Sequence, residues 1–368
     1  MSVWGLEFRI AIALFVVLIP LALWPLVYFH YRRHGRFAGV PALVTGATFL
    51  YVCGLIAFTM FPLPETTDDF CTLRENVSFW QLQPFSFVGD LVRVIEAEGL
   101  VGLATSATLW QVLFNIVLFV PLGFVLVYRY RRGLASVLGI GLLVSLFIEL
   151  TQGTALWGAA GCPYRLADVD DLILNTTGAA CGWLLAKATI RFLPDPDPPP
   201  VADTSVPLVG RRVAAGGLDL LVWGLTVLLL IVLEALIFGG ERTTGEFIDH
   251  WLVVLTSVVV GSMIWLIVPL IRRDRATPGQ IAVWLAQTTP PSQRMPPGRS
   301  AIRFALRWLV FLAIAAWSPI AAAAIVFAYE LAGVFIDRKR RSVSGSAAGV
   351  TVVTRRSLET TKSGADDS

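Results

Sequence analysis

The sequence predicts an all-α protein: a polytopic bundle of about nine transmembrane helices, grouped as five and four, with the N-terminus outside and the C-terminus in the cytoplasm. Three observations predict it. The 368 residues are 56% hydrophobic and only 15% charged, whereas soluble domains carry about 25% charged residues. The apolar residues form stretches near the length of about 20 residues that a bilayer needs. The basic residues gather between alternate stretches, as the positive-inside rule describes.

Eight apolar stretches reach or approach the length of a span. They cover residues 9–29, 39–61, 109–128, 134–152, 171–192, 213–238, 251–271 and 302–336. The last is too long for one helix and contains Ser318-Pro319, and proline breaks or kinks a helix. We therefore expect two short helices there, about 302–317 and 320–336, which makes nine spans. A single tilted, kinked helix is the alternative, with eight spans.

The distribution of Lys and Arg predicts the orientation. If the segments after the first, third, fifth, seventh and last spans are cytoplasmic, most basic residues lie inside. The five exceptions among the 29 are Arg9, Arg74, Arg93, Arg165 and Arg242. An eight-span chain would place the basic run 338–341 outside, which favours nine. The first span lacks a basic leader and a small-x-small cleavage site, so we expect an uncleaved anchor.

A proline-rich segment, PDPDPPPVADTSVPLVG, separates five spans from four. Such a run prefers an extended, semi-rigid conformation. We expect a first membrane domain, this cytoplasmic linker, a second membrane domain and a polar mobile tail, over residues 1–193, 194–210, 211–341 and 342–368. Outside the spans, residues 85–108 predict an interfacial amphipathic stretch, and residues 277–300 predict a cytoplasmic loop.

The four cysteines indicate a compartment. Cys71 and Cys162 fall in two loops that the topology places outside, where the environment is oxidising. A Cys71–Cys162 disulfide is therefore one hypothesis, and four isolated thiols are the alternative. Cys53 and Cys181 lie in spans, where a thiol behaves as a small apolar group.

The first half concentrates polar residues in or beside its spans, where they are costly and mark functional sites by default. Asn115 lies in the third span, about 9 Å from its outer end at 1.5 Å per residue. Glu149 and Gln152 end the fourth span one helical turn apart, and Arg165 precedes the fifth. Arg165 departs from the positive-inside pattern, and a carboxylate partner would explain its position.

The fifth span opens with DVDDLILNTTG, and four of its residues share one helix face at intervals of three, four and three. They are Asp168, Asp171, Asn175 and Gly178. With Asn115 and its neighbours they predict one pocket, open to the outside, while Asp170 points elsewhere. The alternative is structural: aspartates cap a helix N-terminus, amides bridge helices, and Pro121 and Gly123 provide a kink and a close approach.

Three ordered motifs, NIVLFVPLG, ELTQ and RLADVDDLILNTTG, resemble the VanZ family over about residues 40–190. The resemblance implies as characteristic positions Asn115, Pro121, Gly123, Glu149, Gln152, Arg165, Asp168, Asp171, Asn175 and Gly178. The family's outer loop carries an Asn-x-x-Pro-Phe-like element, of which Gln83-Pro84-Phe85 keeps only Pro-Phe. The resemblance implies the bacterial plasma membrane and low-level resistance to the glycopeptide teicoplanin. The implied partners are the lipid bilayer and a lipid-linked cell-wall precursor or glycopeptide.

The second half resembles the RDD family over about residues 208–354, through RRVAAGGLDLLV, ATPGQ, IRFALRWL and DRKRRSVSGSAAGVTVV. Gln280 stands where that family has Lys, and Ser344-Gly345 stand where it has His-Asp. Arg212 and Asp219 lie seven residues apart on one helix face. We expect Asp219 to need a partner inside its span, and a structural ion pair is the first interpretation. Transport is the alternative.

Several chemistries lack their sequence signals. None of His30, His34 and His250 lies beside a Cys or acidic cluster with metal spacing, so we expect no metal site; a divalent cation on carboxylates of the pocket is the alternative. Phosphate-loop and nucleophile-elbow motifs do not occur, and we expect no cofactor. A net charge of +3 does not favour nucleic acid. We expect a non-enzymatic envelope protein; a membrane enzyme using Glu149 and an Asp is an alternative.

Overall fold

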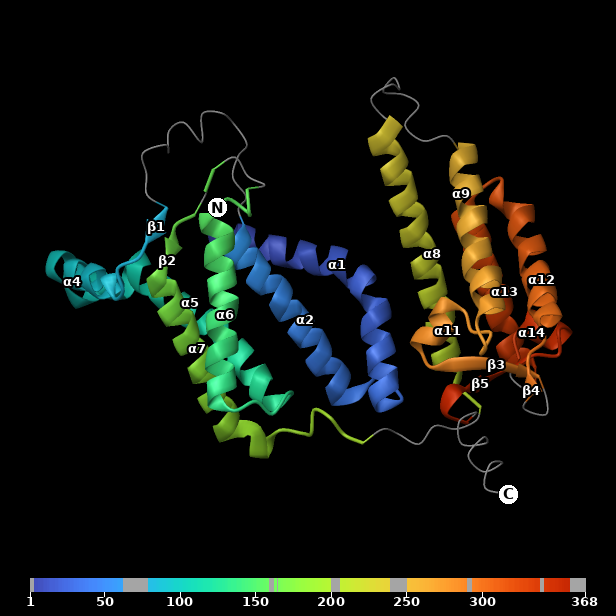
Figure 1. The fold of residues 1–368 in the computed structure, drawn as a ribbon, viewed down its shortest axis with the longest axis horizontal. Coiled ribbons are helices and arrows are strands. Elements are labelled where there is room, and N and C mark those ends of the chain that lie inside the picture. The colour runs from blue at the N-terminus through green and yellow to red at the C-terminus, as the bar shows by residue number, and fades with distance from the viewer. Residues whose placement is uncertain are drawn as a thin grey trace. The chain divides into compact units, whose positions relative to one another are not determined.

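The computed structural model describes residues 3–61, 79–158, 162–163, 165–199, 206–238, 250–289, 293–337 and 341–357. It is mostly helical, at 77%, and divides into two units (Figure 1). Unit 1 comprises Met1–Val17 and Gly39–Pro198, and unit 2 comprises Leu18–Ala38 and Pro199–Ser368. The division falls in the proline-rich segment, and the second half of α1 (Val3–His34) belongs to unit 2.

Unit 1 is built on α5 (Ala107–Tyr128), α6 (Leu134–Gly153) and α7 (Val169–Thr189), with α2 (Gly39–Met60) against α5 and α6. The helices α5 and α7 pack backbone to backbone. A Cβ built on Gly123 would lie 2.0 Å from the backbone oxygen of Ala179, and one built on Gly178 would lie 2.1 Å from that of Ile116. Small residues permit such an approach between helices. Pro121 lies inside α5 without ending it.

A short parallel pair, β1 (Trp80–Gln81) and β2 (Ala167–Asp168), leads into α4 and α7 respectively. The amphipathic stretch expected near residues 85–108 is α4 (Ser86–Thr105), which is interrupted at Gly99 with φ 69° and has no buried residue. At its other end, α7 continues into a short 3-10 turn, η1 (Ile190–Phe192).

Four longer helical segments make up the core of unit 2: α8 (Val209–Phe238), α9 (His250–Ser262), α12 (Pro297–Ala315) and α13 (Pro319–Ile336). The second of these, α9, continues through a π-helix, η3 (Met263–Ile267), into α10 (Val268–Ile271). Trp223, Phe311 and Ala322 lie in the hydrophobic core of unit 2. The chain breaks between α12 and α13 where the Ser318-Pro319 pair predicts it, because the Ser318 hydroxyl caps α13 through the Ala321 N–H.

The all-α prediction needs correction at one end of unit 2. Here α11 (Pro278–Ala282) and α14 (Val343–Ala347) accompany a three-stranded antiparallel sheet, β4-β3-β5. Its strands are β3 (Leu285–Thr289), β4 (Gln293–Arg294) and β5 (Thr351–Thr354). Residues 277–289 and 293–300 of the expected loop are therefore folded, and so are residues 342–357 of the expected mobile tail. The reason is burial: every residue of β3 is buried, and β5 alternates between buried and half-buried.

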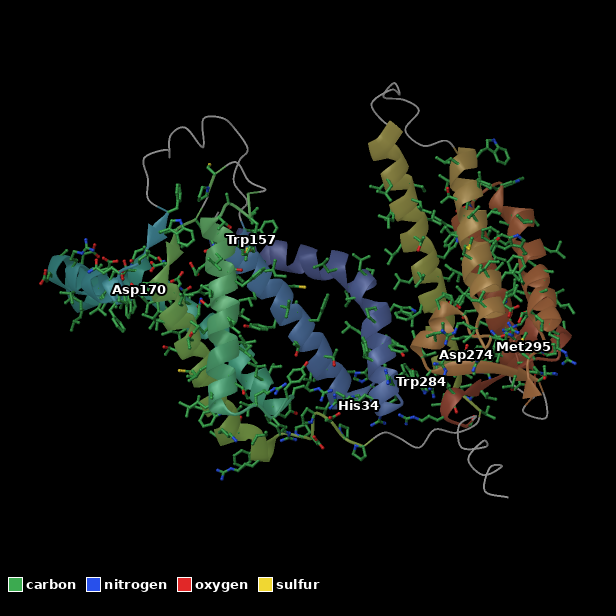
Figure 2. The ribbon with its side chains drawn as sticks, viewed as in Figure 1. His34, Trp157, Asp170, Asp274, Trp284 and Met295 are labelled. Atoms are coloured by element: carbon green, nitrogen blue, oxygen red, sulfur yellow. The ribbon has the colours of Figure 1, made fainter. Side chains whose placement is uncertain are left out.

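Two further contacts hold this end of unit 2 together. Val27 and Tyr31 of α1 pack in one cluster with Leu218 and Val352, which explains why residues 18–38 join unit 2. Asp274, labelled in Figure 2, accepts two hydrogen bonds from Arg272, at 2.9 and 3.0 Å, and pairs with Arg355. Burial raises the pKa of Asp274, but the hydrogen bonds and the two positive charges outweigh it, so the pKa lies below its ordinary value.

Six of the described helices are long and apolar enough to cross a membrane. They are Gly39–Met60, Ala107–Tyr128, Leu134–Gly153, Val209–Leu233, Trp251–Ile271 and Pro319–Ile336. Three expected spans, those in α1, α7 and α12, are not among these six. Helix α7 opens with two aspartates, and α12 carries three arginines. Several apolar helices thus indicate a membrane protein, while nine spans and their orientation remain a prediction.

Candidate functional site

A cavity of about 640 Å³ lies in unit 1, lined by the ends of α2 and α6 and by residues of α5 and α7. It brings together six of the seven residues predicted for the pocket: Asn115, Glu149, Gln152, Arg165, Asp171 and Asn175. The rest of its lining includes aromatic and aliphatic side chains, among them Phe58 and Leu118. Polar groups from four separate segments of the chain therefore face one space.

The amides bridge the helices, as the structural interpretation expects. Asn115 of α5 donates from Nδ2 to the Asp171 carboxylate of α7, and Asn175 donates from Nδ2 to Ser145 Oγ of α6 at 2.9 Å. Asn175 itself is 4% exposed, and its Oδ1 accepts no hydrogen bond from the described residues. A buried acceptor without a donor is costly, and a ligand N–H or O–H would satisfy it.

Ser145 is a residue that the sequence analysis missed. It is fully buried and contributes the hydroxyl that Asn175 contacts. A signal for it existed, because Ser145 precedes Glu149 by four residues, and such a spacing places both on one helix face.

Glu149 and Asp168 meet at the start of α7. The Glu149 carboxylate is buried and accepts the Asp168 backbone N–H at 2.9 Å. Asp168 is not among the residues that line the cavity; its own carboxylate caps α7 by accepting the Asp170 N–H at 2.8 Å. Burial and the charge of Asp170 raise the pKa of the Asp168 carboxyl above its ordinary value. Asp168 therefore caps the N-terminus of α7.

Arg165 and Gln152 both reach the last turn of α2. Arg165 Nη1 donates to the carbonyl oxygens of Phe58 and Thr59, each at 3.0 Å, and Gln152 Nε2 donates to the Thr59 oxygen at 2.6 Å. These carbonyls lack partners within their own helix and carry the negative end of its dipole. The carbonyl groups at the end of α2 therefore help to hold Arg165 in the lining of the cavity.

Asp170 has a role that the sequence analysis did not predict. It is 3% exposed, and its carboxylate accepts the backbone N–H groups of Phe85 and Phe87 at 2.5 and 2.9 Å and the hydroxyl of Ser86 at 2.5 Å. Figure 2 shows Asp170 at the start of α7, facing the chain that leads into α4. Asp170 does point away from the cavity, but it fixes the segment that follows β1.

This segment carries the Pro-Phe element. Gln81, three residues before Pro84, bonds through its side-chain amide to the Gln83 oxygen at 2.8 Å and to Ser86 Oγ. An amide side chain, that of Gln81, thus occupies the position of the Asn in the Asn-x-x-Pro-Phe-like element. The comparison based on Gln83, which directly precedes Pro84, did not reveal this. The spacing from Pro84 was the signal that could have found it.

An apolar groove of about 270 Å³ adjoins the polar cavity, lined by Trp110, Leu113, Phe114 and Val117 of α5. Trp110 and Phe114 line both spaces. Trp110 is 55% exposed and Val117 61% exposed. The polar cavity therefore opens beside an apolar helix face of the kind that contacts lipid.

In unit 2, the two residues of the predicted polar pair, Asp219 and Arg212, each contact another element of the fold. The Asp219 carboxylate accepts the Thr277 hydroxyl at 2.7 Å and the Gly279 N–H at 2.6 Å, so α11 docks on α8. A Cβ on Gly279 would lie 1.9 Å from the Ala215 oxygen, which explains the glycine. Arg212 donates to the Val352 carbonyl oxygen at 3.1 Å.

The cysteines separate into two kinds. Cys53 is a buried free thiol and Cys181 an exposed one, whereas Cys162 is disulfide-bonded. Cys71 lies outside the described residues, so the Cys71–Cys162 pairing stays a prediction.

Comparison with known families supports the resemblance of the first half. Residues 48–191 match the family model of VanZ/LLP1, so unit 1 contains a VanZ-like domain. The comparison gives no support for an RDD-like domain in the C-terminal part. Neither the curated proteins nor the solved structures include a match to the chain.

Proposed function

We propose that the VanZ-like domain binds, without chemical turnover, an amphipathic ligand of the bacterial cell envelope, such as a lipid-linked cell-wall precursor or a glycopeptide. On this proposal the protein lies in the plasma membrane with the cavity facing outward. The observation that carries the proposal is the 640 Å³ cavity, in which polar side chains converge beside an apolar groove.

The chemistry of the lining indicates the polar part of the ligand. Asp171 and Glu149 supply carboxylate oxygens, and Asn175 Oδ1 is an acceptor without a donor among the described residues. Such a set accepts hydrogen bonds from hydroxyl, amide or ammonium groups, which sugars and peptides carry. The groove along Trp110 and Val117 would take an apolar chain.

Substitution of the acceptors tests the proposal. Asn175→Ala and Asp171→Asn should each abolish any glycopeptide resistance that the protein confers, and weaken binding of a lipid-linked wall precursor to the purified protein. Thr177→Ala is the matched control, because Thr177 lies exposed on the same helix and, among the described residues, its hydroxyl bonds to the Ile173 oxygen of its own helix. Unchanged binding and resistance in both variants, at wild-type membrane abundance, would contradict the proposal.

A membrane enzyme is the second candidate, because Glu149 and Asp171 line the same cavity and two carboxylates can act as acid and base. A pH–rate profile with wall-lipid substrates separates the two functions. Turnover that Glu149→Gln abolishes would favour the enzyme, whereas saturable binding without turnover would favour the binding domain.

A further inference from the structure

A second polar cavity, separate from the VanZ-like domain, lies inside unit 2. It measures about 80 Å³ and is bounded by α8, α12, α13, β3 and β5. Its charged lining consists of three arginines and two carboxylates: Arg212, Arg303, Arg307, Asp219 and Glu330. The small sheet closes the end of the helices here, so the arginines face an internal space.

Both carboxylates are already engaged. Asp219 accepts hydrogen bonds from α11 on both oxygens. Glu330 accepts the Ser344 N–H at 3.1 Å, the Ser344 hydroxyl at 2.7 Å and Arg307 Nη2 at 2.9 Å. Three guanidinium groups thus face two carboxylates, and the cavity keeps one positive charge in excess.

The arginines also keep unused donors. Arg303 is 4% exposed; its Nε donates to Ser344 Oγ at 3.2 Å and its Nη2 to Ser342 Oγ at 3.1 Å. Its Nη1 is buried and has no hydrogen-bond partner among the described residues, and the same holds for Arg307 Nε. Buried cationic donors without acceptors are strongly unfavourable, so an acceptor that supplies negative charge would complete this cluster.

We propose that this cavity binds an oxyanion of the phosphate type. Guanidinium groups match phosphate oxygens in geometry and charge. One water needs roughly 10–15 Å³ of such space, so a cavity of about 80 Å³ holds a single tetrahedral anion and little more. The anion is either free phosphate or the phosphate of a lipid headgroup. The lining also includes apolar side chains, among them Phe327 and Leu331.

The experiment uses the full-length protein, delipidated in detergent, and follows thermal unfolding at constant ionic strength. Inorganic phosphate, added against chloride, tests the free anion; phosphatidylglycerol, added against a zwitterionic lipid with the same chains, tests the headgroup. A saturable rise of the melting temperature with phosphate identifies a free-anion site. A rise with the anionic lipid alone, together with lipid phosphorus that co-purifies stoichiometrically, identifies a headgroup site. Absence of both effects in the wild-type protein would overturn the proposal.

Variants then locate the site. Arg303→Gln should raise the half-saturating concentration of the effective anion by about ten- to hundredfold, the size expected for a lost charge-assisted hydrogen bond. Arg299→Gln is the matched control, because Arg299 lies one turn away on α12 and is exposed. If Arg303→Gln does not fold, Arg307→Lys, which keeps the charge but removes Nε, should weaken binding less severely. Equal affinity in the wild type and a folded Arg303 or Arg307 variant would place the anion elsewhere and refute this site.

Discussion

Replacing Gly178 by Ala tests whether the pocket depends on backbone contact between α5 and α7. A Cβ at this position would lie 2.1 Å from the Ile116 backbone oxygen and 2.9 Å from its carbonyl carbon. A close carbon–oxygen contact in proteins measures about 3.3 Å, so the two helices must separate locally by roughly 1.2 Å. Neither partner can rotate away, because the contact is with backbone and not with a flexible side chain.

The magnitude follows from two opposing effects. Overpacking costs about 1–3 kcal/mol, and a rigid backbone contact favours the upper part of that range. Ala stabilises a helix by about 1 kcal/mol relative to Gly, so the expected net loss is about 1–2 kcal/mol. Asn115 lies beside Ile116 in sequence, and Asn175 lies one turn from Gly178, so the separation also displaces two polar groups of the cavity.

Thermal unfolding of the purified chain, followed by tryptophan fluorescence, measures this loss. Gly139→Ala is the matched control: Gly139 lies in α6, and a Cβ there meets nothing within 4 Å, so only the stabilising effect should remain. Gly178→Ala should melt several degrees below Gly139→Ala, since about 1 kcal/mol corresponds to roughly 2–4 °C in a domain of this size. Equal melting temperatures would refute the close-packing argument.

Three further perturbations have defined outcomes. Asp170→Ala removes the acceptor for the Phe85 and Phe87 amides, so hydrogen exchange at both should rise about tenfold or more, and unchanged protection would contradict that role. Asp274→Asn should lower the free energy of unfolding by about 1 kcal/mol at neutral pH. The pKa of Asp274 is lowered in the folded state. The stabilisation by its carboxylate is therefore present above the ordinary pKa near 4 and disappears as the pH falls through the folded pKa. The difference between variant and wild type in denaturant unfolding should therefore shrink toward pH 3, and a difference independent of pH would count against the ion-pair explanation. Asp219→Asn should destabilise unit 2 by about 1–3 kcal/mol, because one of two buried donors then faces an NH₂ group, whereas wild-type stability would show that these hydrogen bonds contribute little.

The helices of unit 1 could be predicted closely from sequence. The stretch 134–152 became α6 (Leu134–Gly153), and 109–128 became α5 (Ala107–Tyr128), because an apolar run bounded by Gly, Ser or Arg has few alternatives to a helix. The strands β3 and β5 could not be predicted in this way. They are five and four residues long, and each is stabilised by a partner more than 60 residues away in the chain.

The candidate site was likewise predictable from the sequence only in part. Intervals of three and four residues indicated that Asp171 and Asn175 share a face of α7, and both line the cavity. Those intervals carried no information about the partner of each side chain. The carbonyl groups at the end of α2, to which Arg165 donates, could not be inferred from spacing, and neither could the role of Asp170 in fixing the start of α4.

Local patterns along the chain were enough to indicate a helical membrane protein with a VanZ-like domain in its first half, and to show which side chains share a helix face. They were enough because apolar length and helical period are local properties of the chain. Which helix faces meet became clear from the packing of the helices. The glycine contacts of α5 and α7 bring Asn115 to Asp171, and the folding of the C-terminal segment onto α8 encloses the arginines of unit 2. Both depend on the distances between helices, which packing determines and the pattern of a single helix does not.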